Sequence, residues 1–394
     1  MKNTVLFIVL PVLFLLRIPL VSFAQDGDQK PNLVVDDDKV QCPAAGFTTI
    51  QSAVNAARPG DVIRVCPGTY NEQVVISKSV HIHGDDGAVV IPTGMTPNAI
   101  SIPSGNSVAA AILVQNTERV TLEGLIIDGS HNNVTTCSAD LSGILYQNAS
   151  GAIRHNAIRH FRLSAALSGC QSGEGIVIQA GGEASTVTVN ANSVWDYQKN
   201  GITGDESGTQ VNIDRNAVTG IGATSGAAQN GIQVGFGARG AVTNNSITDN
   251  VYAPCVTAAQ CPANATGILI FQSDGVEVES NSVGTNQIGV AVAADSVKVD
   301  ANTIFNSVAL DGVFLMGNDN QVRTNQILHS DEAGVFVQGN GNRIVGNEIT
   351  DTVVGIFKVS GSTGNTLVNN LIHATLIPVI DPAPIRTINL APMR

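Results

Sequence analysis

The stretch GVFVQGNGNRIVGNEI, residues 334–349, contains three short apolar segments and no run long enough for a helix. Apolar and polar residues alternate within each segment, which is typical of β-strands. The unit occurs nine times, with a Gly before an apolar run and, 13 to 17 residues later, an Asn followed two residues on by Ile or Val. These Asn residues are Asn156, Asn192, Asn216, Asn245, Asn281, Asn302, Asn325, Asn347 and Asn370. A unit of 21 to 36 residues cannot bury its own apolar face, so the copies must stack into a solenoid.

Three strands in every unit predict an all-β fold, a single-stranded right-handed parallel β-helix of about ten to twelve coils. The handedness follows from the rule for parallel crossovers. One Asn at the same corner of each coil has a structural explanation, because its amide can bond to the same amide in the coils above and below. Asn also tolerates the left-handed backbone of a tight turn. We therefore interpret the Asn column as part of the scaffold.

The composition agrees with narrow coils. Charged residues are 13% of the chain, against roughly 25% in ordinary proteins. The repeat runs without a linker over residues 113–373, so residues 25–394 are expected to form one domain. Within it, residues 25–112 would hold the N-terminal cap and first coils, and residues 374–394 a C-terminal tail. The net charge of −12 argues against a nucleic-acid partner.

Residues 1–24 have the pattern of a signal peptide. Lys2 precedes an apolar run of about 12 residues, and small residues lie at the expected cleavage point after Ala24. This run is shorter than the roughly 20 residues of a membrane span. We expect a secreted, extracellular protein without a membrane span.

Six cysteines fit an oxidising compartment, and position in the chain favours three local pairs. The expected disulfides are Cys42–Cys66, Cys137–Cys170 and Cys255–Cys261, each of which brackets a cap or an insertion. No cofactor and no metal site is expected. His81 and His83 share one face of a strand, but the sequence offers no evident third ligand.

A short helix is expected near the N-terminus of the mature chain. Thr48 and Gln51 have the spacing of a capping box, Ile50, Ala53, Val54 and Ala57 share one helical face, and Pro59 and Gly60 follow. An amphipathic helix here would cover the exposed edges of the first coil.

The segment FTTIQSAVNAA, residues 47–57, and the segment CPGTYNEQV, residues 66–74, resemble the first segment of pectinesterases and of other secreted right-handed β-helix proteins of the pectate-lyase-like superfamily. With the repeats, this resemblance covers nearly all of the mature chain. It implies the fold, while a β-helix by itself does not imply an activity. The catalytic motifs of pectinesterases, pectate lyases, polygalacturonases and alginate epimerases are all absent from the sequence, so no pectinolytic site can be transferred.

The strand that begins each coil usually carries the substrate groove in such proteins. Alternation from each Gly predicts the following outward residues: Leu145, Gln147, Val177, Gln179, Thr203, Asp205, Gln233, Gly235, Leu269, Phe271, Ala291, Ala293, Phe314, Met316, Phe336, Gln338, Phe357 and Val359. Asp205 is the one charged residue among them, whereas a glycosidase needs two facing carboxylates. The last coils present Phe residues, which predicts that the C-terminal tail or a partner covers them, with sugar stacking as the alternative.

Insertions at residues 159–172, 219–229 and 251–265 should wall the N-terminal half of this groove. Acidic, basic and aromatic residues converge around them: Arg154, His155, Arg159, His160, Arg162, Glu174, Trp195, Asp196, Tyr197, Asp205 and Glu206. We take Gln179, Trp195, Tyr197, Thr203, Asp205 and Gln233 as candidate ligand-binding residues because they combine neutral hydrogen-bonding groups with two polar aromatics.

Two functions remain open. The first is a secreted protein that binds an extended ligand, such as a polysaccharide or a cell-envelope polymer, without pectinolytic chemistry. The second is a polysaccharide lyase or glycoside hydrolase with a site on the loops over the second to fourth coils. The chain is expected to be a monomer or to associate through the apolar C-terminal half of the groove face.

Overall fold

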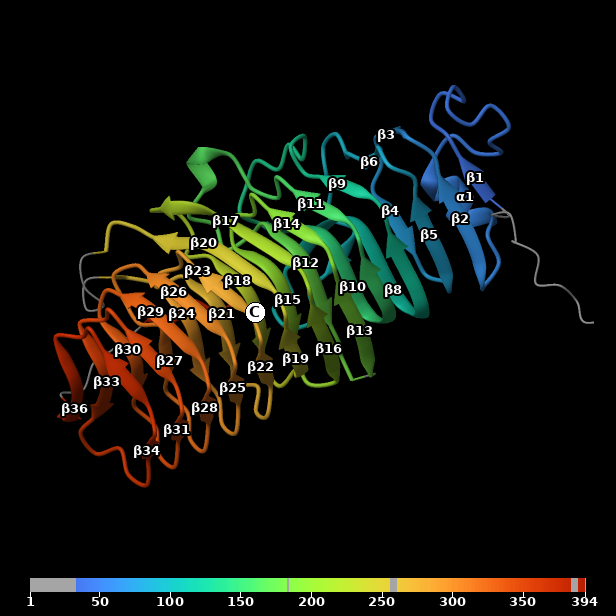
Figure 1. The fold of residues 1–394 in the computed structure, drawn as a ribbon. Helices are drawn as coiled ribbons and strands as arrows, with labels where there is room; N and C mark the ends of the chain where they lie inside the picture. Colours follow the sequence, from blue (N-terminus) through green and yellow to red (C-terminus); the bar gives the residue numbers. More distant parts are fainter. Residues whose placement is uncertain (1–32, 183, 256–260, 384–388, 394) are drawn as a thin grey trace, which may run out of the picture. The chain divides into compact units, whose positions relative to one another are not determined.

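We describe the protein from a computed structural model, which defines residues 33–182, 184–255, 261–383 and 389–393 (Figure 1). The predicted signal peptide lies outside the described residues. The structure is the predicted right-handed parallel β-helix, in which short strands stack coil upon coil. No helix among the described residues has the length and apolar character that a membrane crossing would need.

Three stacks of strands, which we call the first, second and third sheets, run along the coils; the first two are joined through the long strands β8 and β10 into one 24-stranded sheet. The first sheet contains β4 (Val74–Ile76), β8 (Ser107–Glu123), β10 (Ala139–Arg154), β12 (Glu174–Gln179), β15 (Asn200–Asp205), β18 (Asn230–Gly235), β21 (Thr266–Phe271), β24 (Ile288–Ala293), β27 (Val313–Leu315), β30 (Ala333–Val337), β33 (Val354–Val359) and β36 (Ile377–Ala383). The second contains β1 (Leu33–Val35), β2 (Asp61–Val65), β5 (Val80–Gly84), the later halves of β8 and β10, β13 (Ser185–Asn190), β16 (Thr209–Asp214), β19 (Arg239–Thr243), β22 (Glu277–Glu279), β25 (Lys298–Asp300), β28 (Gln321–Arg323), β31 (Arg343–Val345) and β34 (Thr366–Val368).

The third sheet has twelve strands, one from each of twelve coils. They are β3 (Gly68–Tyr70), β6 (Ala88–Val90), β9 (Ile126–Asp128), β11 (Ala157–Arg159), β14 (Ser193–Trp195), β17 (Ala217–Thr224), β20 (Ser246–Tyr252), β23 (Ser282–Gly284), β26 (Thr303–Ser307), β29 (Gln326–Ser330), β32 (Glu348–Thr350) and β35 (Leu371–His373). All pairings between the named strands are parallel except that of β7 (Ala99–Ile100) with β8.

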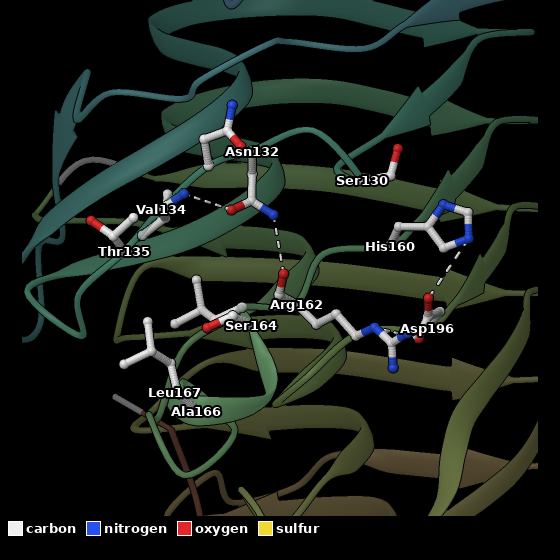
Figure 2. A pocket seen from close by; sticks show the side chains of 12 residues that line it. Ser130, Asn132, Val134, Thr135, His160, Arg162, Ser164, Ala166, Leu167 and Asp196 are labelled. Atoms are coloured by element: carbon white, nitrogen blue, oxygen red, sulfur yellow. Dashed lines mark hydrogen bonds and ion pairs between the residues drawn. The ribbon is translucent and has the colours of Figure 1, made fainter.

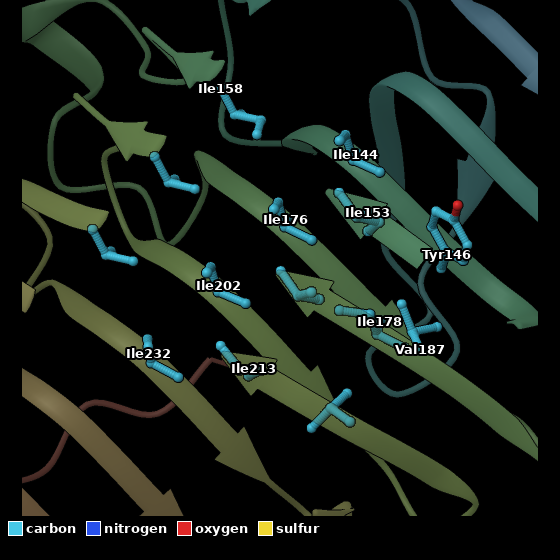
Figure 3. Packing of buried hydrophobic residues seen from close by; sticks show 14 of the residues in the cluster. Ile144, Tyr146, Ile153, Ile158, Ile176, Ile178, Val187, Ile202, Ile213 and Ile232 are labelled. Carbon is cyan, nitrogen blue, oxygen red and sulfur yellow. The ribbon is translucent and has the colours of Figure 1, made fainter. Parts of the chain in front are cut away.

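The core is built from columns of identical or similar side chains. Ile144, Ile176, Ile202 and Ile232 occupy the same register on β10, β12, β15 and β18, and each is at most 1% exposed (Figure 3). Strand alternation directs these residues inward in every coil. The apolar periodicity of the sequence therefore becomes a continuous buried stack.

The Gly that opens each unit is required by close approach between coils. A Cβ on Gly175 would lie 2.6 Å from the carbonyl oxygen of Gly201 and 2.5 Å from Cγ1 of Val194. A Cβ on Gly231 would meet the carbonyl oxygen of Gly267 at 2.6 Å. Since real side chains do not tolerate such distances, the Gly column fixes the place where each coil bends over the next.

The predicted Asn ladder is confirmed. The backbone N–H and the side-chain amide of Asn302 both donate to Oδ1 of Asn325, at 2.8 and 3.0 Å, and Asn325 bonds in the same way to Asn347. The same pattern links successive members from Asn156 to Asn370. Each amide thus joins its coil to the next.

The expected left-handed conformation lies one residue earlier than the sequence suggested. Ala191, Ala301 and Thr324, which precede Asn192, Asn302 and Asn325, have φ values of 53°, 53° and 52°. The Asn residues themselves do not have positive φ. The preceding residue makes the turn, and the Asn satisfies the hydrogen bonds that the turn exposes.

The predicted helix is α1 (Ile50–Ala56), which lies at the N-terminal end of the described coils and buries Ile50, Ala53 and Val54. The predicted capping box is displaced. Thr49 is the N-cap, and the carboxylate of Glu72 accepts hydrogen bonds from the N–H groups of Ile50 and Gln51 at 2.6 and 2.8 Å. The N-cap therefore lies one residue later than predicted, with Thr49 accepting from the N–H of Ser52, while the Gln51 side chain bonds to Val75. The sealing role of the helix stays a prediction.

The three expected disulfides, Cys42–Cys66, Cys137–Cys170 and Cys255–Cys261, are all present. The Cys137–Cys170 bond ties the loop after β9 to the insertion that carries the 3-10 helix η1 (Ala165–Leu167). The C-terminal tail is in part a further strand, since β36 pairs with β33.

The ladder predicts that Asn325→Ala lowers the free energy of unfolding by at least about 1 kcal/mol, because buried groups of two neighbouring coils lose their partners. The matched control is Asn340→Ala, whose amide is exposed and can be replaced by water. Urea unfolding of both variants measures the difference. Equal stability of the two variants would contradict a stabilising ladder.

Candidate functional site

Two segments of the chain lie over parts of the outer face of the first sheet in the described residues. Near the N-terminal coils, the segment at residues 98–106 lies over it, with the side chain of Gln147 donating to the carbonyl of Ile100 at 2.6 Å and the N–H of Ile102 donating to Gln179 at 3.2 Å. Farther along, residues 389–393, which we call the terminal segment, lie on the same face. The groove predicted from the sequence is therefore covered where these two segments lie.

Three carboxylates meet under this cover. Asp140 on β10, Glu174 on β12 and Asp205 on β15 are 7%, 5% and 2% exposed and line one small cavity with Gln179 and Met393. The cavity volume is about 10 Å³, which is roughly the space of one water molecule. The three acidic groups thus come from three successive coils to one closed site.

The expectation that Asp205 is the one charged residue of this face is wrong. Strict alternation from Gly175 places Glu174 inward, yet Glu174 lies on the outer face. The reason is the bend at the Gly column, where a Cβ on Gly175 would point toward the buried Val194. The residue before each Gly therefore faces the groove as well. The alternation of inward and outward residues has to be counted anew from that residue.

Burial controls the protonation of these groups. It raises the pKa of Glu174 to about 8, with further contributions from Asp205 and Asp140 and an opposing hydrogen bond from Thr203. Burial also raises the pKa of Asp140 to about 6, against a hydrogen bond from Asn106. Near neutral pH the site therefore holds a protonated carboxyl at Glu174 beside other carboxylates.

A hydrogen-bond network orients the groups. Thr203 donates its hydroxyl to Oε1 of Glu174 at 2.9 Å, and the amide of Gln233 donates to both carboxylate oxygens of Asp205, at 3.0 and 3.1 Å. Asn200 donates to Thr203 at 3.0 Å and to Gln233 at 3.3 Å. Every one of these side chains is at most 5% exposed, so the network is rigid.

The terminal segment completes this network with backbone groups. The carbonyl of Met393 accepts from the Gln233 amide at 2.6 Å, and the N–H of Met393 donates to Oε1 of Gln233 at 2.9 Å. The carbonyl of Ala391 accepts from Nζ of Lys199 at 2.7 Å and from the Asn230 amide at 2.9 Å. Burial lowers the pKa of Lys199 to about 7, against the attraction of Glu174.

The apolar half of the face behaves as predicted for coverage by the tail. Leu390 of the terminal segment packs against a cluster that contains Phe314 and Phe336, both 0% exposed. The rings of Phe314, Phe336 and Phe357 are stacked, with centroids 4.9 and 5.1 Å apart. Coverage by the terminal segment is thus shown for part of this face, while association with a partner stays a prediction.

The six candidate binding residues do not form one group. Gln179, Thr203, Asp205 and Gln233 lie together in the groove network. Trp195 is half-buried on β14 of the third sheet, with the guanidinium of Arg159 at 5.7 Å from its ring centroid. Tyr197 is 0% exposed and donates its hydroxyl to Asn250 at 2.5 Å inside the coil. From the sequence, Glu174 is expected among the residues around the insertions but not on the groove face, and neither Asp140 nor Lys199 is named.

A second cavity lies on the side of the third sheet, beneath the insertion held by Cys137–Cys170. Its volume is about 540 Å³, and His160, Arg162, Asp196 and Asn132 line it (Figure 2). Asp196 faces Nε2 of His160 at 3.6 Å and Nε of Arg162 at 3.2 Å. This cavity has room for a small ligand, but its charged groups neutralise one another.

Asp128, which contacts His160 of this cavity, is held ionised by its hydrogen-bond partners. Burial alone would raise the pKa of Asp128, but hydrogen bonds from His160, Ser130 and Arg159 lower it to about 2. The residues around this cavity are therefore held in ion pairs, whereas Asp140 and Glu174, whose pKa values are raised to about 6 and about 8, lie in the groove.

Comparison with known proteins bears on the fold. Residues 256–376 match the family described as Periplasmic copper-binding protein (NosD), which is less than half of the chain. No curated protein matches the sequence. Similar solved structures include a lacto-N-biosidase from Eubacterium ramulus, with TM-score 0.57, 14% identity, and coverage of 86% of this chain and 67% of that chain.

Two further structures are similar over nearly their whole length. The DFA-IIIase of Arthrobacter chlorophenolicus, solved without its lid in complex with GF2, has TM-score 0.58, 14% identity, and coverage of 88% of this chain and 99% of its own. A mannuronan C-5 epimerase A-module from Azotobacter vinelandii has TM-score 0.52, 14% identity, and coverage of 90% and 99%. These likenesses confirm the right-handed β-helix fold predicted from the sequence.

The matched segment does not fit a copper site in its described part. Over residues 261–376, no three His, Cys, Asp or Glu side chains gather closely enough to hold an ion. His329 and His373 each pair with a single acid, Asp351 and Glu348 respectively. We therefore assign no metal chemistry to this segment.

The raised pKa of Glu174 predicts a specific pH dependence of stability. Between its ordinary value of 4.5 and about 8, the folded chain keeps a proton that the unfolded chain releases, so this group lowers the stability increasingly as the pH rises through that range. Glu174→Gln removes the effect. We expect the melting temperature of the variant to exceed that of the parent at pH 8 and to differ little near pH 5.

Thermal unfolding across pH 5 to 8 measures this difference. Glu279→Gln, at an exposed position of β22, is the matched control and should follow the parent curve. If the gap between Glu174→Gln and the parent does not grow with pH, then Glu174 is ionised in the folded state.

Proposed function

We propose that the protein is a carbohydrate-active β-helix protein that cleaves or transfers a glycosidic bond at the cluster of Asp140, Glu174 and Asp205. The observation that carries this proposal is the meeting of these three buried carboxylates in one site, with Glu174 protonated near neutral pH. Of the two functions left open by the sequence, the geometry favours the enzyme.

The chemistry follows from the two kinds of carboxyl group. Cleavage of a glycosidic bond needs one protonated carboxyl that donates to the leaving oxygen and one carboxylate that acts as nucleophile or activates water. Glu174 has the protonation of the acid. Asp205, which accepts two hydrogen bonds from the Gln233 amide, has the environment of the carboxylate.

The surrounding groups suit a neutral sugar. Gln179, Thr203 and Gln233 offer uncharged donors and acceptors for hydroxyls. Among the described residues that bond within this groove, Lys199 is the one cation, and burial lowers its pKa to about 7. A chain of uronates, whose carboxylates need repeated cationic partners, fits this environment less well.

The structural neighbours support the substrate class. Their names describe a lacto-N-biosidase and a DFA-IIIase bound to GF2, and the latter was solved without its lid. The present chain shares their fold at 14% identity, so the argument for sugar rests on the carboxylates and the neutral groove groups.

Access to the site requires movement of the terminal segment. A volume of about 10 Å³ cannot hold a sugar ring, and Met393 lines this space directly. The proposal therefore includes displacement of residues 389–393 from Gln233, Asn230 and Lys199 when substrate binds. In their place, sugar hydroxyls would take up the same hydrogen-bonding groups.

A second candidate is ligand binding without turnover. It is favoured by the complete hydrogen bonding of the closed site, which is typical of a structural network. In that case, the exposed sides of the coils would hold a polysaccharide or cell-envelope polymer, and the carboxylates would serve only the fold.

We also propose that the protein is exported and acts outside the cell. The disulfides support an oxidising compartment, and the signal-like residues 1–24 of the sequence support export. In this setting the chain acts as a monomer or associates through the apolar half of the groove face.

The enzymatic proposal predicts product release from a panel of neutral oligosaccharides, measured as new reducing ends or transfer products by mass spectrometry. Glu174→Gln and Asp205→Asn should each lower the rate by about 10²-fold or more, because the acid or the carboxylate is lost. Glu277→Gln, an exposed carboxylate on β22, is the control. Trp195→Ala should leave the rate unchanged, since Trp195 lies on another sheet.

Three results are informative. Turnover that survives both groove substitutions excludes this site. Binding of a glycan without any product, by the parent and by a chain shortened after Ala383, favours the second candidate. Absence of both binding and turnover in the two chains across the panel contradicts a role in carbohydrate recognition.

Displacement of the terminal segment predicts that Leu390→Asp increases activity or sugar affinity. The charge cannot remain against the apolar cluster of Phe271, Phe314 and Phe336, so the segment should leave the groove. Leu376→Asp, at a leucine that is already 79% exposed, is the matched control. Lower activity of Leu390→Asp with an unchanged melting temperature would show that the segment is part of the site rather than its cover.

A further inference from the structure

A cluster of His81, His83 and Glu123 lies on the second sheet, away from the groove. His81 and His83 are alternate residues of β5, and Ile82 between them is 0% exposed, so both imidazoles face outward. The register of β5 with β8 places Glu123 directly beside His83. Two nitrogen ligands and one carboxylate thus share one exposed surface.

The distances suit a bound ion. Nε2 of His81 lies 3.0 Å from Oε2 of Glu123, and Nδ1 of His83 lies 3.9 Å from the same oxygen. One candidate ligand atom from each residue lies within 4.8 Å of the other two. Ligand atoms around a tetrahedral zinc ion are about 3.4 Å apart, as follows from bonds of about 2.0–2.1 Å. Small side-chain rotations would therefore bring all three atoms to one ion.

We propose that His81, His83 and Glu123 form a binding site for a divalent transition-metal ion, with zinc as the ion that fits the donor set best. Two imidazoles and one carboxylate are a ligand set that zinc uses with a water in the fourth position. Hard ions such as magnesium prefer oxygen ligands and are excluded by the two nitrogens.

The third ligand was hidden from sequence reasoning because Glu123 lies 42 residues after His81. It enters the site only through the stacking of β5 on β8. The side chains of His81, His83 and Glu123 are 33%, 47% and 21% exposed, so an ion can reach them from solvent.

Arg154 is the present counter-charge of this site. Its Nη2 lies 3.0 Å from Oε2 of Glu123, and its side chain is 45% exposed. The exposed guanidinium can turn into solvent when an ion enters, and its proximity should weaken the affinity.

The other close groups of possible ligands do not compete with this site. Cys42 and Cys66 form a disulfide and cannot act as thiolates. The run Asp36, Asp37 and Asp38 offers oxygen ligands alone, which suit a hard ion rather than zinc. Among the close groups of the described residues, that of His81, His83 and Glu123 combines two imidazoles with a carboxylate.

Isothermal titration of the purified chain with zinc tests the proposal, with magnesium as the negative control ion. The parent should bind one zinc ion, and His81→Gln, His83→Gln and Glu123→Gln should each weaken the affinity by at least about tenfold. Arg154→Gln should strengthen it. His329→Gln, an exposed His that pairs with the single acid Asp351, should bind as the parent does.

Binding of copper followed by electron paramagnetic resonance provides a second readout, since two nitrogen ligands leave a characteristic splitting that His83→Gln should reduce. Melting temperatures without metal show that the variants remain folded. Zinc affinity that is the same in the parent and in the double variant of His81 and His83 would overturn the assignment, as would a parent that binds no zinc.

Discussion

The hydrogen bonding between parallel coils is the constraint on which the rest of the structure depends. The strands of one coil expose their N–H and C=O groups along both edges, and only a neighbouring coil about 4.8 Å away can satisfy them. The Gly column allows that approach, because any Cβ would meet the carbonyl of the next coil. At the opposite corner, where the strand is interrupted, the Asn ladder supplies the missing acceptors. Both columns are consequences of one spacing.

The same spacing between coils brings acidic side chains from distant parts of the sequence together. Asp140, Glu174 and Asp205 lie 34 and 31 residues apart in the sequence, yet they line one cavity because each sits on the next coil of the same sheet. A flexible chain would separate such acids, whereas a rigid stack holds them side by side. Burying these acids close together disfavours their ionised forms, and this is why the pKa values of Glu174 and Asp140 are raised. His81 and Glu123 meet by the same means on another sheet.

Much of this fold could be predicted from the sequence, because residues at the same position of successive repeats contact one another in a solenoid, so its contacts appear as a periodic pattern. The Asn ladder, the three disulfides, α1 and the coverage of Phe314 and Phe336 follow from spacing and local chemistry. The candidate site was predictable only in part. Gln179, Thr203, Asp205 and Gln233 obey strand alternation, but Glu174 does not, since the bend at Gly175 resets the count. Tyr197 follows the strand β14, where the alternation that would point it beside Trp195 no longer applies. Pairings that need the register between distant strands, such as His83 with Glu123, have no local signal.

The terminal segment shows what the groove is equipped to bind. Lys199, Asn230 and Gln233 all donate to its backbone carbonyls, and each of these donors is 0% exposed. If the segment left and nothing replaced it, each of these buried donors would lose one hydrogen bond, at a cost of about 0.5–1.5 kcal/mol, while keeping a second partner in Ala228, Asn200 or Asp205 respectively. Water can replace a carbonyl, and so can a sugar hydroxyl, which accepts as well as a carbonyl does and also donates. That extra donor matters here, because a hydroxyl can donate to the carboxylate of Asp205, whereas a peptide carbonyl cannot. A hydroxyl-rich chain can therefore match the bonds that the terminal segment makes and also donate to Asp205, and such differential affinity is what displacement of a covalently tethered competitor requires.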